Sequence, residues 1–208
     1  HTRFDCDWSS DVCSSDLIAD FAIAMAGMIS APIYPTAGEK TIAYVIEHSE
    51  AKAIIVGKLD DIAPAQSALK ALPIMTIAMP YETVACTYQM NALIAANAPI
   101  PEVAQPALDD IFSLTYTSGS TGNPKGAVIT FRNIAYGASA MTEQAGLTSD
   151  DGLLSYLPLA HVAERSVIEH ASLYSGSCVT FVESLATFTE DLQNAEPAFF
   201  FSVPRLWM

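Results

Sequence analysis

Hydrophobic residues follow two alternating patterns along the chain, one with the spacing of a helix and one with the continuity of a buried strand. Between residues 18 and 29, apolar side chains recur every three or four positions, which predicts an amphipathic helix that Pro32 ends. The apolar run 53–56, closed by Gly57, instead predicts a short buried strand. Alternation of the two patterns predicts an α/β fold with mostly parallel sheets and helical crossovers.

The same patterns continue to the end of the chain. Thr36 with Glu39, and Thr187 with Glu190, have the spacing of a capping box, so we expect a helix to begin at each pair, the first burying Ile42, Val45 and Ile46. Gly146 and Gly176 are expected helix stops. Further helices are expected over 60–71, 88–96, 133–146 and 162–174, and further strands over 73–78, 111–116, 127–131, 153–157, 178–182 and 198–203.

Residues 1–16 carry neither pattern. They hold two of the four cysteines, Cys6 and Cys13, among clustered Ser and Asp residues. We therefore expect this segment to be non-native or disordered, and the α/β domain to occupy residues 17–208.

Glycines, hydroxyl residues and a lysine are concentrated in residues 116–126, YTSGSTGNPKG, between two apolar, β-prone runs. A glycine-rich loop between strands lets backbone N–H groups turn toward an anion. Hydroxyl side chains can donate to phosphate oxygens, and a lysine adds positive charge. We therefore predict a phosphate-binding loop whose contributors are Thr117, Ser118, Gly119, Ser120, Thr121, Gly122, Lys125 and Gly126.

Two other interpretations of this loop are weaker. A Walker A motif read from Gly119 would place Pro124 where its second glycine belongs and Gly126 where its Ser/Thr belongs, and β-branched residues follow in place of a helix start. A surface turn without a ligand accounts for Gly, Ser, Asn and Pro, but it needs neither so many hydroxyls nor the lysine.

Three motifs in order resemble the adenylate-forming (AMP-binding) superfamily. The loop and its continuation 127–130 resemble the phosphate-loop signature of that superfamily. Residues 157–165, LPLAHVAER, and 201–207, FSVPRLW, resemble segments of its long-chain fatty acyl-CoA synthetase branch. Ala163 departs from the branch, whose members often carry an aromatic residue there. The resemblance implies that the chain is part of the large N-terminal domain of such an enzyme, with the C-terminal domain absent.

The resemblance also implies an activity. A fatty acid would be activated by ATP to an acyl-adenylate and then transferred to CoA, with Mg²⁺ as cofactor. Lys125, Thr121 and His161 are the expected catalytic residues, and no residue is assigned as a metal ligand. The family's Tyr-Gly-x-Thr-Glu-like segment, ribose aspartate and C-terminal lysine do not follow Gly126. We therefore expect the 208 residues alone to be inactive.

Bland alternatives remain for several of these residues. A single histidine at a helix start is usually a structural hydrogen-bonding group, and His161 has no neighbouring His or Cys to form a metal site. Glu164 and Arg165 have the appearance of a solvated charge pair. Arg205 is interpreted as structural.

The amino-acid composition limits the kinds of binding partner and the cellular location that we expect. Nine Lys and Arg against 23 Asp and Glu give a net charge of −14, which argues against nucleic acid as a partner. The longest apolar run near the start, 21–29, is too short to span a bilayer, which leaves peripheral membrane contact open. The cysteines show no metal-binding spacing, so a cytoplasmic location is expected. A P-loop-type hydrolase and a non-catalytic domain that binds a nucleotide or a partner remain the alternatives.

Overall fold

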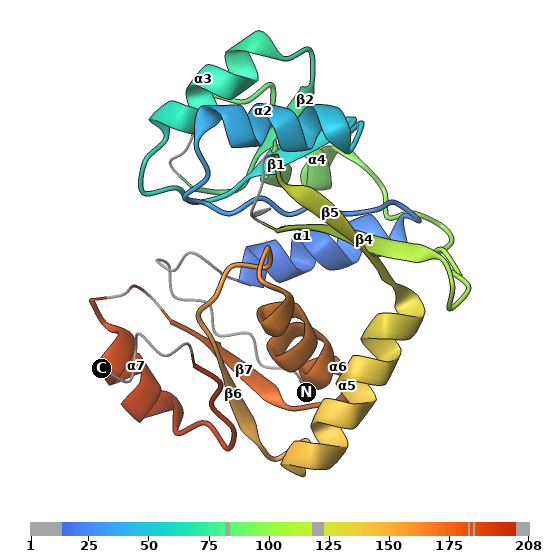
Figure 1. Ribbon diagram of the computed structural model, residues 1–208, viewed down its shortest axis with the longest axis vertical. Helices are drawn as coiled ribbons and strands as arrows, with labels where there is room; N and C mark the ends of the chain where they lie inside the picture. Colours follow the sequence, from blue (N-terminus) through green and yellow to red (C-terminus); the bar gives the residue numbers. More distant parts are fainter. Residues whose placement is uncertain (1–13, 82–83, 118–122, 183, 185, 203–208) are drawn as a thin grey trace. The chain divides into compact units, whose positions relative to one another are not determined.

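The computed structural model describes residues 14–81, 84–117, 123–182, 184 and 186–202. These residues divide into two compact units, with the boundary after Phe131. Each unit is described by itself (Figure 1).

The first unit contains a three-stranded parallel sheet in the order β1-β2-β3. Ala53 pairs with Met75 and Ile77 pairs with Tyr88, and helix α3 connects β1 to β2. Apolar residues of α2, β1 and α3, with Val84, form the core on one side of this sheet. The helices and strands are α1 (Ser14–Met25), α2 (Glu39–His48), β1 (Ala53–Val56), α3 (Ala63–Ala71), β2 (Met75–Ala78), β3 (Tyr88–Gln89) and α4 (Met90–Ala96).

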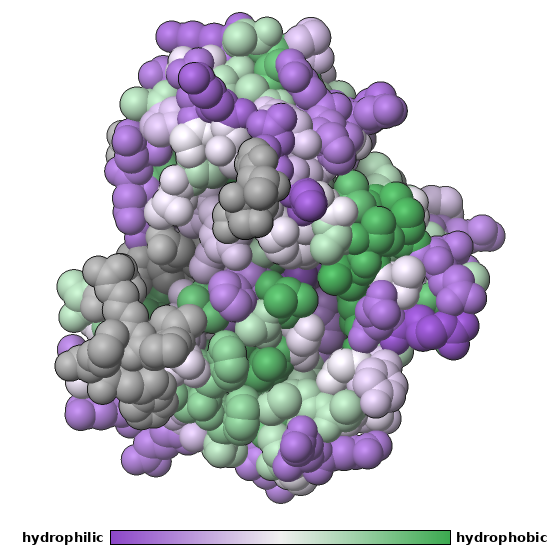
Figure 2. All heavy atoms as spheres, in the orientation of Figure 1, coloured by the Kyte–Doolittle hydropathy of each residue, from purple (hydrophilic) through white to green (hydrophobic). Residues whose placement is uncertain are grey.

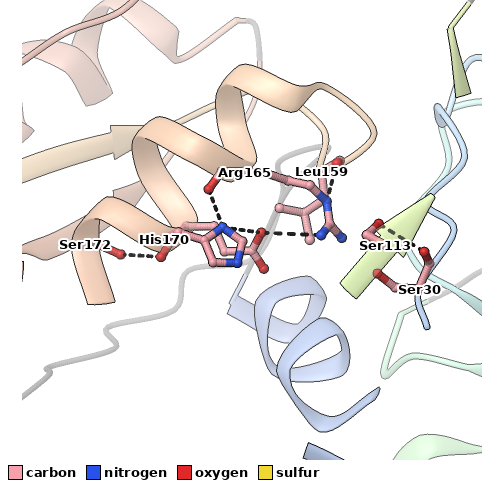
Figure 3. Close-up of polar contacts among 7 residues, drawn as sticks. Ser30, Ser113, Leu159, Arg165, His170 and Ser172 are labelled. Atoms are coloured by element: carbon pink, nitrogen blue, oxygen red, sulfur yellow. Dashed lines mark hydrogen bonds and ion pairs between the residues drawn. The ribbon is translucent and has the colours of Figure 1, made fainter. Parts of the chain in front are cut away.

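An antiparallel hairpin completes this unit. Strands β4 (Ile111–Thr117) and β5 (Lys125–Thr130) pair from Ile111 with Thr130 to Thr117 with Lys125. The connection between them is too short for the crossover that parallel strands need, so the chain must double back. Ser30 anchors β4: its carbonyl oxygen accepts from the Ser113 hydroxyl at 3.0 Å and from Leu114 N–H at 2.8 Å (Figure 3).

The second unit is built around a parallel pair, in which Gly152 of β6 pairs with Cys178 of β7. Leu147, Leu153, Ile168 and Ala171 form its core. The helix between the two strands begins with a π-helical stretch, η1, and continues as α6 until Gly176, which adopts a φ of 78°. The elements are α5 (Phe131–Ala145), β6 (Gly152–Ser155), η1 (Glu164–His170), α6 (Ala171–Ser175), β7 (Cys178–Phe181) and α7 (Phe188–Ala195).

The α/β fold is confirmed, while several boundaries were wrong. Helix α1 ends before Gly27, which takes a φ of 72°, and not at Pro32. Gly38, with no side-chain cap bond, precedes α2, so the Thr36–Glu39 capping box does not form. Thr187 does precede α7, but it makes no side-chain cap bond, so the Thr187–Glu190 capping box does not form either; its hydroxyl donates to Asp191 at 2.7 Å.

The expected strand 198–203 is wrong over its described part. Residues 198–202 contain a single bridge, from Phe199 to Leu153, and no extended ladder. At the other end, residues 14–16 belong to α1 and are not disordered, while residues 1–13 lie outside the described part of the chain.

The face of α2 and α3 in Figure 2 is covered mostly by hydrophilic side chains. Cys86 and Cys178 are free thiols. Among the helices of the described residues, none has the length and apolar character needed to cross a membrane.

Candidate functional site

The described part of the predicted phosphate loop is its neck, where β4 ends and β5 begins. Thr117 and Lys125 are direct partners across the hairpin, and both are exposed. Directly opposed residues of antiparallel strands share one face, so the Thr117 hydroxyl and the Lys125 ammonium group are presented on the same face. Ser118, Gly119, Ser120, Thr121 and Gly122 lie outside the described residues, so their predicted roles stay predictions.

Tyr116 occupies the opposite face of the neck and is only 7% exposed. It is paired with Gly126, and a Cβ atom at Gly126 would approach the Tyr116 ring carbon Cζ to 3.3 Å. The structure therefore gives Gly126 a second reason to be glycine besides the predicted approach of a phosphate: a side chain would press on the tyrosine ring.

The Tyr116 hydroxyl lies 2.9 Å from Nδ1 of His48, the last residue of α2. The two rings meet edge to face with centroids 5.7 Å apart, and the Tyr44 ring stacks on His48 with centroids 5.2 Å apart. Burial raises the pKa of Tyr116, the nearby Tyr44 raises it further, and a hydrogen bond with Ser49 lowers it. Neither His48 nor Tyr44 was identified from the sequence, because nothing in the local pattern connects α2 to the loop.

His161 lies in the second unit, after β6 and before the π-helical stretch. Its side-chain Nδ1 accepts a hydrogen bond of 3.2 Å from Ala163 N–H, and its backbone N–H donates to Pro158 O at 2.8 Å. These bonds match the structural interpretation of this histidine. They leave its predicted catalytic role as a prediction.

The interpretation of Glu164 and Arg165 as a solvated pair was wrong, because each is only 2% exposed. Glu164 accepts from the Ser155 hydroxyl at 2.6 Å and from Leu157 N–H at 3.3 Å. Burial raises the pKa of Glu164 to about 7, against the opposing effect of the hydrogen bonds from Ser155 and from the backbone of Leu157 and Tyr156.

Arg165 points to a different set of partners (Figure 3). Its Nε donates to Leu159 O at 3.0 Å, and its guanidinium lies 3.9 Å from the buried carboxylate of Glu169. His170 donates from Nδ1 to Arg165 O at 2.6 Å and lies 3.6 Å from the same carboxylate. The Arg165–Glu169 pair has the i,i+4 spacing of an α-helix, whereas the bond from His170 to Arg165 O spans five residues, the spacing of a π-helical turn.

Metal binding has no side-chain cluster to support it in the described part of the chain. Over these residues no group of three or more His, Cys, Asp or Glu side chains could hold an ion. Mg²⁺ remains an expectation from the resemblance.

Comparison with known protein families assigns the chain to one of them. The family model described as AMP-binding enzyme matches residues 14–208. The chain belongs to the AMP-binding enzyme family. Arg205 and the rest of 203–208 fall within this match but outside the described residues.

The curated relatives of this AMP-binding chain are long-chain acyl-CoA synthetases. It is 30% identical to long-chain-fatty-acid–CoA ligase 1 of Homo sapiens over 201 residues, which cover 86% of this chain and 28% of the relative. It is 28% identical to long chain acyl-CoA synthetase 6, peroxisomal, of Arabidopsis thaliana over 204 residues, or 92% of this chain and 29% of the relative. The chain therefore spans under a third of the length of these two relatives.

Solved structures show the same fold. The anthranilate CoA ligase AuaEII in complex with anthranoyl-AMP superposes with a TM-score of 0.76 at 21% identity, over 91% of this chain and 38% of the ligase. ATP-bound MatB from Rhodopseudomonas palustris superposes with a TM-score of 0.71 at 20% identity, over 89% of this chain and 36% of MatB. The α/β architecture of this AMP-binding chain is that of adenylate-forming enzymes.

Proposed function

We propose that the protein containing this chain activates a long-chain fatty acid with ATP and transfers the acyl group to CoA. The observation that carries the proposal is the hairpin neck, which presents the Thr117 hydroxyl and the Lys125 ammonium group on one exposed face beside a loop rich in glycine and hydroxyl residues. The naming of the curated relatives as long-chain acyl-CoA synthetases and ligases supports the substrate class.

The first step of this reaction is attack of a fatty-acid carboxylate oxygen on the α-phosphorus of ATP. A new bond forms between that oxygen and phosphorus, the bond to the β-phosphate oxygen breaks, and pyrophosphate leaves with the electron pair. Negative charge grows on the leaving group, so the protein's contribution is electrostatic. Lys125 and the hydroxyls of Thr117, Ser118, Ser120 and Thr121 would stabilise the pyrophosphate.

The second step has different demands on the protein. The thiol of CoA attacks the acyl carbon, and AMP leaves with no pyrophosphate involved. Loop residues that stabilise pyrophosphate should therefore matter for the first step and little for the second. We propose that the 208 residues alone do not complete either step at the rate of a whole synthetase, since they span under a third of the relatives' length.

The experiment measures both half-reactions in a longer protein that contains this chain and has the length of its relatives. Lys125→Ala and Thr121→Ala should slow fatty-acid-dependent pyrophosphate exchange about a hundredfold or more, the usual effect of removing a donor to developing charge. Transfer of preformed acyl-adenylate to CoA should change little. Lys40→Ala, an exposed lysine of α2, is the matched control and should leave both steps intact. Equal loss in both half-reactions would contradict the assigned roles, and ATP binding without any exchange would favour a non-catalytic binding domain.

A further inference from the structure

A side-chain hydrogen bond between His48 and Tyr116 joins helix α2 to the hairpin neck across 68 positions of sequence. His48 Nδ1 and the Tyr116 hydroxyl are 2.9 Å apart, in a part-buried setting. His48 is the last residue of α2, whose Ile42 and Ile46 lie in the core of the parallel sheet. The bond thus connects the neck to a helix that is itself fixed by core packing.

The position of the Tyr116 ring is transmitted to the exposed residues by strand pairing. Tyr116 and Gly126 form the pair immediately before Thr117 and Lys125. The ring lies against Gly126 so closely that a Cβ there would come within 3.3 to 3.5 Å of three of the tyrosine's ring and hydroxyl atoms. Movement of the ring would therefore shift the backbone of Gly126. Lys125 directly precedes Gly126 in β5, so it would shift as well.

The imidazole of His48 is suited to holding this hydroxyl with either ring tautomer. A tyrosine hydroxyl can donate to a ring nitrogen without a hydrogen or accept from one that carries a hydrogen. Tyr44, one helical turn earlier, stacks on the ring with an interplanar angle of 28° and limits its rotation. Because burial raises the pKa of Tyr116, the phenol keeps its proton at neutral pH.

We propose that His48 is a positioning residue for nucleotide binding, which through the Tyr116 hydroxyl holds Thr117 and Lys125 in place for the polyphosphate of ATP. This inference rests on the proposed function. His48 does not itself touch the nucleotide in this arrangement. Its effect is to lower the cost of ordering the neck when the phosphates bind.

The test is to titrate the isotopically labelled 208-residue chain with ATP. The shift of the Lys125 amide resonance in the NMR spectrum gives the affinity. Tyr116→Phe and His48→Phe each remove the hydrogen bond while keeping a ring, and each should weaken ATP binding about fivefold to tenfold, the usual worth of one hydrogen bond. Tyr116→Phe also removes the bond with Ser49, so the double variant should bind no more weakly than Tyr116→Phe alone. His48→Asn places a polar atom near the position of Nδ1 and should recover most of the affinity. Tyr88→Phe, the same change at an exposed tyrosine of β3, is the matched control.

The outcomes separate this inference from the proposed function. If the folded wild-type chain does not bind ATP, this inference fails, whereas the proposed function is decided separately by the two half-reactions of the longer protein. If it binds, and Lys125→Ala weakens binding while the two Phe variants do not, the positioning role alone is overturned. Thermal unfolding of every variant checks the fold, because a purely structural bond would lower Tm without changing the affinity of the folded chain. Should Tyr116→Phe not fold, His48→Phe against His48→Asn decides, and equal affinities overturn the inference.

Discussion

Thr117 and Lys125 are exposed at the hairpin neck, whereas Glu164, Arg165 and Glu169 are buried around η1. Both regions concentrate polar side chains next to a strand end, and both lie in stretches that resemble family motifs. Their energetics differ. An exposed lysine loses little hydration on folding and can respond to a ligand, while a buried carboxylate must be satisfied inside the protein. The comparison separates exposed polar residues that can bind a ligand from buried polar residues that interact with one another inside the protein.

The largest expected effect is from removing Arg165. Arg165→Ala should lower the free energy of unfolding by about 3 to 5 kcal/mol, because the 0% exposed Glu169 carboxylate would lose its nearby cation. Urea denaturation followed by circular dichroism measures the change. Lys125→Ala, which removes an exposed cation, should change the same quantity by about 0.5 kcal/mol or less.

Replacing the whole buried pair sharpens the point. Arg165→Met combined with Glu169→Leu should recover most of the stability lost in Arg165→Ala, since no uncompensated charge remains. A double variant as unstable as the single one would show that Arg165 acts through packing and its bond to Leu159 O, and not through charge.

The next effect is a dependence of stability on pH. Burial raises the pKa of Glu164 to about 7 from 4.5, so between these values the folded protein holds a proton that the unfolded chain has released. Stability from this group is full below pH 4.5 and is lost as the pH rises toward 7, by about 3 kcal/mol in all.

Glu164→Gln removes the titration while keeping an acceptor for Ser155. Its free energy of unfolding should therefore lack this fall between pH 4.5 and 7, and chemical denaturation at a series of pH values compares the two proteins. An identical pH dependence in both would show that Glu164 is not the group responsible.

A smaller loss of stability than at Arg165 or Glu164 is expected from a change at Gly126 in the neck. Gly126→Ala should destabilise the chain by about 1 kcal/mol, because the new methyl group would press on a Tyr116 ring that His48 holds in place. In the Tyr116→Phe background the ring is freer to move, so the cost should fall. Thermal unfolding of the two single variants and the double variant measures the coupling; additive losses would mean that the ring yields equally well with and without its hydrogen bond.

Sequence patterns were sufficient for several features whose deciding forces are local. The apolar run 53–56, the glycine stops at 146 and 176, and the two strands flanking the loop are all found in the structure. Each depends on periodicity or on the backbone freedom of one residue, which a sequence displays directly.

Features that depend on distant partners were missed. Glu164 next to Arg165 has the composition of a surface pair, and only the packing of the second unit shows that both are buried. His48 and Tyr116 are 68 positions apart, so no local pattern could join them. The π-helical turn escaped for a related reason, because apolar spacing averaged over a helix does not register one widened turn.

The bond between Ser113 and Ser30 has a consequence for the order of folding. The hairpin closes over eight positions, from Thr117 to Lys125, while its anchor on Ser30 spans 83. By the logarithmic dependence of closure entropy on chain length, the longer closure costs about 2 kcal/mol more. The two strands can therefore meet before the anchor forms, so the hairpin would assemble as a local unit early and be docked late, once the intervening sheet has brought Ser30 near.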